Sequence, residues 1–106
     1  MTDYSKLSDR EIDRLVLNTI YGVHADDKDI QGCWSRGGFK YTSDASDAWP
    51  IIVDNGISLE CIIVNRHEKT WRAQFKPAYV KHHMNHKNPL RAAMIVFLQM
   101  QEDNHD

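Results

Sequence analysis

The feature that most constrains this 106-residue chain is the apolar segment NPLRAAMIVFLQMQ near its C-terminus. Asn88 is placed as a helix N-cap, and Pro89 takes the first helical position, where its missing amide proton costs nothing. The apolar residues span roughly 240° of a helical wheel and leave a narrow polar stripe with Ile95 inside it. Such a helix is either packed on two sides or partly exposed as a protein interface, to which Ile95 and Gln99 would belong.

Two further helices carry clear end signals. Ser8 and Glu11 have the spacing of a capping box, apolar residues then recur at the helical period, and Gly22 supplies a stop. The segment TSDASDAWPIIVDNG, residues 42–56, predicts a helix between Asp44 and Gly56. Pro50 lies inside it and removes a backbone hydrogen bond, so this helix either kinks or is divided in two.

The strand predictions concern the remaining segments. Residues 23–32 show no sustained period, which predicts at most a strand start and then a loop. In CWSRGGFKY, residues 33–41, two glycines between aromatic runs predict a hairpin. A second hairpin is predicted from ISLECIIV, residues 57–64, and WRAQF, residues 71–75. The first of these strands is apolar on both faces and would lie centrally in the sheet if both are covered.

The expected order is therefore αββαββα. It predicts a single α+β domain over residues 1–106, with an antiparallel sheet of about four strands, three helices packed on it and residues 103–106 as a disordered tail. Helices on both faces would make it a three-layer α/β/α sandwich. Cys33 and Cys61 lie in apolar, strand-like contexts and are expected to be buried free thiols.

Charge is distributed unevenly along the chain, although the net charge is only −2. Residues 66–91 hold seven Lys or Arg against one acidic residue, a net charge of +6. A candidate basic patch in this segment comprises Arg66, Lys69, Arg72, Lys81, His82, His83, His86, Lys87 and Arg91. Trp71, Phe75 and Tyr79 are interleaved as a stacking platform for nucleic acid would require. However, Trp71 and Phe75 are expected to face inward, and a pI near 6.3 argues against a dedicated nucleic-acid binder.

The stretch KHHMNHK, residues 81–87, places His82 and His86 four residues apart, the spacing of a helical metal site. No carboxylate or thiol is close in sequence, and Lys81 and Lys87 would repel a cation. An exposed basic loop, or one that faces an anion, is therefore expected here, and no metal site.

The chain carries no catalytic motif, so an enzyme and a bound cofactor are not expected. No apolar run is long enough to span a membrane, and the N-terminus resembles neither a signal nor a transit peptide, which predicts a soluble, cytoplasmic protein. What remains is a protein that binds another protein, with nucleic-acid binding by residues 66–91 as the alternative. Because residues 1–65 carry a net charge of −5 against the basic segment, a homodimer is also compatible with the sequence.

Five segments carry a family resemblance: YSKLSDREIDRLV, DAWPII, NGISL, WRAQF and NPLRAAMIVFLQM. Together they resemble the NinX-type proteins of lambdoid bacteriophages, within a broader group described as a phage α-β-α sandwich domain. The resemblance implies a phage or prophage source and a compact domain with helices on both sides of a sheet, and it implies little about activity. Together with the absence of a catalytic motif, it favours a phage accessory protein that binds a host or phage protein. It implies no catalytic residues, and residues 23–41 and 65–87 match least.

Overall fold

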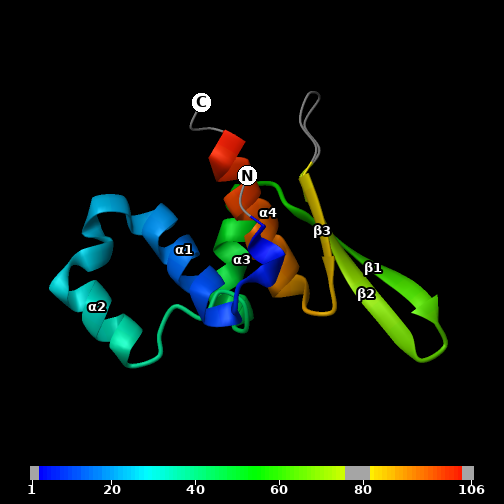
Figure 1. The fold of residues 1–106 in the computed structure, drawn as a ribbon, viewed down its shortest axis with the longest axis horizontal. Coiled ribbons are helices and arrows are strands. Elements are labelled where there is room, and N and C mark those ends of the chain that lie inside the picture. Colours follow the sequence, from blue (N-terminus) through cyan, green and yellow to red (C-terminus); the bar gives the residue numbers. More distant parts are fainter. Residues whose placement is uncertain (1–2, 76–81, 104–106) are drawn as a thin grey trace.

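The computed structural model describes residues 3–75 and 82–103 (Figure 1). In chain order the elements are η1 (Tyr4–Lys6), α1 (Asp9–Tyr21), η2 (Gly22–Asp26), α2 (Lys28–Ser35), α3 (Ala45–Asp54), β1 (Ser58–Asn65), β2 (Glu68–Phe75), β3 (His82–His86) and α4 (Pro89–Asp103). The three strands form one antiparallel sheet in the order β1-β2-β3. Asp103, the first residue of the predicted disordered tail, is the last residue of α4. Residues 104–106 of that tail lie outside the described residues, and the single domain over residues 1–106 remains a prediction.

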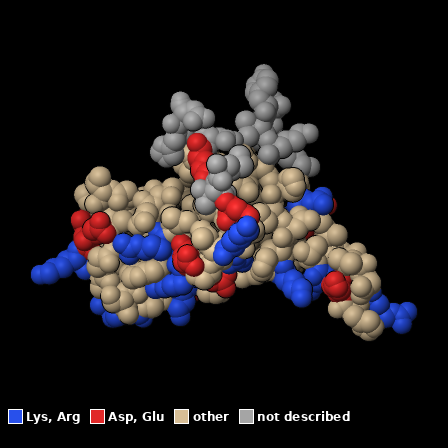
Figure 2. Space-filling view, in the orientation of Figure 1, with Lys and Arg blue, Asp and Glu red and all other residues tan. Residues whose placement is uncertain are grey.

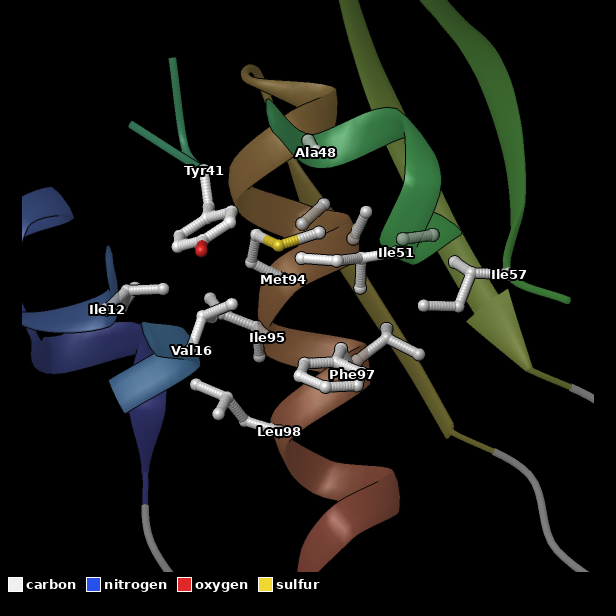
Figure 3. Packing of buried hydrophobic residues seen from close by; sticks show 14 of the residues in the cluster. Ile12, Val16, Tyr41, Ala48, Ile51, Ile57, Met94, Ile95, Phe97 and Leu98 are labelled. Atoms are coloured by element: carbon white, nitrogen blue, oxygen red, sulfur yellow. The ribbon is translucent and has the colours of Figure 1, made fainter. Parts of the chain in front are cut away.

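Helix α4 is the middle of the molecule. It packs against the sheet on one side and against α1 and α3 on the other (Figure 1). Figure 3 shows Met94 and Ile95 of α4 among Ile12 and Val16 of α1 and Ile51 of α3. Ile95 is only 1% exposed, so the wide apolar surface of this helix is explained by packing on two sides. The expectation that Ile95 lies at a protein interface is thus corrected, and Gln99 is half-buried.

The α+β class is confirmed, whereas the number and placement of its elements differ from the prediction. The described residues form four α-helices and three strands, in place of three helices and about four strands. The described helices lie on one side of the sheet (Figure 1). The sheet is the first layer, α4 is the second, and α1 and α3 together form the third. The described part of the chain therefore does not form a three-layer α/β/α sandwich.

Residues 22–26 form the 3-10 helix η2 and residues 28–35 form α2, so the predicted loop over residues 23–32 and the hairpin over residues 33–41 are both wrong. The two glycines end helix α2 instead of turning a hairpin. The Gly38 amide donates to the Cys33 carbonyl at 2.9 Å, and the Gly37 amide donates to the Trp34 carbonyl at 3.0 Å, with a φ of 87° at Gly37. This is the Schellman arrangement, which needs a residue with positive φ just after the helix.

The predicted ends of α1 and α3 are confirmed. Ser8 and Glu11 form both hydrogen bonds of the capping box, and Gly22 caps the end of α1. Asp44 caps α3, which continues through Pro50 as one helix and is therefore not divided there. Its end is also a Schellman motif, in which Gly56 has a φ of 66° and the Ile57 amide donates to the Ile52 carbonyl at 3.0 Å.

The hairpin of β1 and β2 is confirmed, but the central strand is β2 and not β1. Its turn is stabilised by Asn65, whose side-chain oxygen accepts the His67 amide at 2.9 Å. Residues 82–86 form strand β3 and not a loop, paired with β2 from Trp71 opposite His86 to Phe75 opposite His82. Both cysteines are free as expected, but neither is buried: Cys33 is half-buried in α2, and Cys61 is exposed in β1.

Candidate interaction surface

The strand register divides the sheet into two different faces. Leu59, Ala73, Phe75 and Met84 lie on the face that packs against the core. Side chains alternate along a strand, so the residues between them lie on the opposite face. We call this the outer face, and it comprises Ser58, Glu60, Ile62, Thr70, Arg72, Gln74, His83 and Asn85. No described helix lies on that side of the sheet (Figure 1).

The outer face is mixed in chemistry. Arg72 lies at its centre, where its Nε donates to the Asn85 side-chain oxygen at 3.2 Å and its terminal nitrogen lies 3.9 Å from the Glu60 carboxylate. His83 is exposed on β3, and Ile62 contributes an apolar side chain on β1. The face therefore offers one shielded guanidinium, an imidazole and apolar surface side by side.

The tip of the hairpin adds an exposed apolar and basic cluster. Ile63 is 68% exposed and Val64 is 55% exposed, and the register shifts at this point so that Val64 has no direct partner on β2. A hollow of about 310 Å³ is lined by Ile63, Asn65, Arg66, His67, Glu68 and Lys69. The hairpin extends away from the helices, with Lys and Arg side chains along it (Figures 1 and 2). We call residues 63–69 the hairpin tip.

The predicted basic patch is dispersed over several surfaces. Arg66 and Lys69 lie at the hairpin tip, and Arg72 and His83 lie on the outer face. His82 and His86 share the strand face of Met84, on the helix side of the sheet, and Lys87 follows β3. Lys81, Lys76 and Tyr79 lie outside the described residues. The patch is thus no single basic surface within the described part of the chain.

Arg91 is the clearest departure from the predicted patch. It is 7% exposed, and its guanidinium donates to the Asp9 carboxylate at 2.7 Å and to the carbonyls of Leu7 and Ser5 at 2.6 and 3.2 Å. Its charge is therefore used to hold the N-terminal turn and the start of α1 against α4. It is not available to a ligand.

The histidines of β3 are arranged by strand geometry. His82 and His86 lie on the same face, as residues four apart do in a strand. His86 Nδ1 accepts the Asn88 amide at 2.9 Å, next to the N-cap of α4. Over residues 3–75 and 82–103, no three His, Cys, Asp or Glu side chains gather as metal ligands would.

A second hollow, of about 680 Å³, lies between α1 and the end of α2. It is lined by Asp9, Arg10, Asp13, Trp34, Ser35, Gly37, Lys40, Thr42 and Ser43. Its most unusual group is Asp13, a buried carboxylate whose Oδ1 accepts both the Thr42 amide and the Thr42 hydroxyl at 2.9 Å. Burial raises the pKa of Asp13 above its ordinary value, and the hydrogen bonds from Thr42 oppose part of that rise.

Arg10, another side chain that lines this hollow, also makes its contacts within the protein. The Arg10 guanidinium lies 3.4 Å from the centre of the Trp34 ring and donates to the Trp34 carbonyl at 3.0 Å. The same side chain lies 3.6 Å from the Asp13 carboxylate. Sequence reasoning missed Asp13, because an aspartate on a helix with a polar side is expected to face solvent. These contacts join α2 and the following loop to α1.

The fold and this surface define a small α+β domain in which the described helices cover one side of the sheet. The family model described as Bacteriophage P22, NinX matches residues 3–101, so the chain belongs to this phage family and the resemblance is confirmed. No curated protein and no solved structure matches the chain significantly. Among the described helices, none is long and apolar enough to cross a membrane.

Proposed function

We propose that this protein is a non-enzymatic phage or prophage accessory factor that acts in the host cytoplasm by binding another protein, from the host or the phage. The outer face of the sheet and the hairpin tip would form its binding surface. The observation that carries the proposal is that this face is uncovered while α4 has both sides packed. A face that combines apolar and polar groups is typical of transient protein interfaces.

The charges of this surface indicate the kind of partner. Arg72, His83, Ile62 and Glu60 lie on the outer face. Arg66, Lys69, Ile63, Val64 and Glu68 belong to the hairpin tip. A partner that presents acidic groups next to apolar ones would complement them. The N-terminal half of the chain, which is acidic, lies on the other side of α4 and would not repel such a partner at close range.

The non-enzymatic part of the proposal is supported by how the buried carboxylate is used. Asp13 has the perturbed pKa that is expected of a catalytic group. Its hydrogen bonds and its ion pair are nevertheless made with Thr42 and Arg10, which join elements of the fold. A role as an anchor accounts for every contact that Asp13 makes in this hollow.

Nucleic-acid binding is the alternative, and the hairpin tip is the observation that favours it. A two-stranded ribbon fits the major groove of DNA, and Arg66 and Lys69 would lie near phosphates. This alternative predicts binding whose logarithm falls linearly with the logarithm of salt concentration. The burial of Arg91 and the pairing of Arg72 with Glu60 reduce the charge available for it.

The proposal is tested by a variant of the outer face and a variant matched to it. Arg72→Glu with His83→Glu reverses the polarity of the outer face, whereas Arg36→Glu with His24→Glu makes the same changes at exposed positions on the helical side. Each full chain is used to capture proteins from phage-infected cells after nuclease treatment. We expect the wild type and the matched variant to retain the same proteins. The outer-face variant should bind these proteins with an affinity at least about tenfold lower, which corresponds to a loss of about 1.4 kcal/mol in binding free energy.

Two results would contradict the proposal. Equal retention of proteins by all three chains would mean that the outer face is not the binding surface. Recovery of nucleic acid alone from lysate without nuclease, with no protein above background, would favour the alternative.

A further inference from the structure

Strand β1 is an unprotected sheet edge. It is eight residues long, and no described segment pairs with the edge of β1 that points away from β2. Its sequence SLECIIVN contains one charged residue, Glu60. A long apolar edge strand exposes a row of backbone donors and acceptors to any other strand, and proteins normally prevent this with charges, proline or a covering segment.

The opposite edge of the same sheet is protected. Strand β3 has five residues, HHMNH, is followed by Lys87, and lies against α4. Short length, polar side chains and a flanking lysine are the usual means of blocking edge pairing. The two edges of one small sheet thus differ, and only β1 has the chemistry of a pairing edge.

We propose that β1 pairs with β1 of a second copy of this chain, antiparallel across a two-fold axis, to form a continuous six-stranded sheet. A two-fold axis brings the same strand together in antiparallel orientation, so one sequence must be compatible with its own reverse. Glu60 is the only charge in β1, and every two-fold register except the one centred on Glu60 keeps the two carboxylates from facing each other. In those registers no charge repulsion within β1 opposes its pairing with a second copy of itself.

The surroundings of β1 fit a second copy better than an arbitrary strand. Antiparallel pairing carries the hairpin tip of one copy toward the start of the other copy's β1, which follows the end of α3. The tip bears Arg66 and Lys69, and α3 ends in Asp54. The same pairing would bring exposed apolar residues together. Ile63 and Val64 at the tip of one copy would lie near Val53, which precedes Asp54 in the other copy. Opposite charges and apolar groups are thus placed near each other at both ends of the pairing.

Pairing through β1 does not depend on the proposed function. It uses the backbone edge of β1, whereas the outer face lies on the flat side of the sheet, and the two surfaces share the hairpin tip. Pairing would join two outer faces into one surface with two-fold symmetry. A monomer could still capture a partner protein, and a dimer could capture none, so each claim can fail without the other.

Sedimentation of the full chain over a range of concentrations tests the pairing. We expect a reversible dimer in the wild type. Ile63→Glu with Val64→Glu adds two negative charges near the end of the edge, and Ile20→Glu with Val23→Glu makes the same changes at exposed positions 43% and 90% accessible on the helical side. The hairpin variant should dimerise at least tenfold more weakly than the matched variant, because its new carboxylates would lie near Asp54 and Glu60 of the second copy.

Cross-linking at Cys61 tests the same claim with no change to the edge. Cys61 is exposed in the middle of β1, and Cys33→Ser removes the other thiol. A short bismaleimide should join two copies of the Cys33→Ser protein, whereas Cys33→Ser with Cys61→Ser should stay unlinked. A wild type that is monomeric at every soluble concentration, a dimer unaffected by the hairpin variant, or a dimer that does not cross-link through Cys61 would each overturn the pairing.

Discussion

At the scale of single residues, Arg72 and Arg91 show why a count of charges did not locate a surface. Both lie in the same basic segment, and both were expected in one patch. Arg72 lies on the outer face of the sheet beside Asn85 and Glu60, whereas Arg91 is held by Asp9, Leu7 and Ser5. The difference depends on contacts with residues more than 80 positions away, which a local pattern of charge does not contain.

Replacement of these two arginines should therefore have unequal effects on stability. Arg91→Ala removes hydrogen bonds to a carboxylate and to two carbonyls, and we expect the free energy of unfolding to fall by about 2 kcal/mol or more. Arg72→Ala removes a partly exposed ion pair and should cost about 1 kcal/mol at most. Urea unfolding of both variants measures the difference. Equal losses would show that Arg91 is not the anchor described.

The burial of Asp13 was not predicted from the sequence. It should make the free energy of unfolding depend on pH. Because burial raises its pKa, the folded state holds the Asp13 proton more tightly than the unfolded state does. Folding is therefore favoured by this group at low pH, and that contribution is lost as the pH rises through the raised pKa. The sign is opposite to that of an ordinary ion-paired aspartate.

We expect Asp13→Asn to gain stability relative to the wild type as the pH rises from about 4 to 7, since the variant has no charge to bury. Its side-chain oxygen can still accept from Thr42. Asp29→Asn, at an exposed position in the first turn of α2, is the matched control for the exchange of Asp for Asn. A difference between wild type and Asp13→Asn that stays constant over this range would contradict the assignment.

At the scale of elements, local signals were read correctly where neighbouring residues decide the structure. The Ser8 and Glu11 capping box, the Asp44 and Asn88 caps and the β1–β2 hairpin are all confirmed. The failures lie where distant contacts decide. Gly37 and Gly38 fit a hairpin or a helix end equally well, and the choice depends on Trp34 packing under Arg10 of α1. Likewise, residues 82–86 form a strand because they pair with the backbone of β2, which lies outside a local window of sequence.

Helix α4 supports the clearest prediction at this scale. Ile95 is 1% exposed and lies next to Val16 of α1 (Figure 3), so Ile95→Ala should leave a cavity and lower the free energy of unfolding by about 2–5 kcal/mol. Val53→Ala, at a position 56% exposed on α3, should change it by about 0.5 kcal/mol or less. Thermal or urea unfolding compares the two. A small loss for Ile95→Ala would mean that one side of α4 is open.

At the scale of the whole molecule, the arrangement of the layers determines where a partner can bind. The sequence predicted a helix that is apolar on too many sides, and the structure accounts for it by placing α4 between the sheet and α1 with α3. The same arrangement leaves the outer face of the sheet uncovered by described helices. Of the predicted site, Arg66, Lys69, Arg72 and His83 lie on the proposed surface, whereas Ile95 and Arg91 are inside the fold. Which residues share a face followed from strand register, which the sequence did not reveal for residues 82–86.

Site-specific photo-cross-linking in phage-infected cells tests the outer face most directly. A photoreactive residue is introduced in place of His83 on the outer face, or in place of His24 at an exposed position on the helical side. We predict protein adducts of defined mass from position 83 that are absent from position 24. The same adducts from both positions, or nucleic acid as the only species joined to position 83, would contradict a protein-binding outer face.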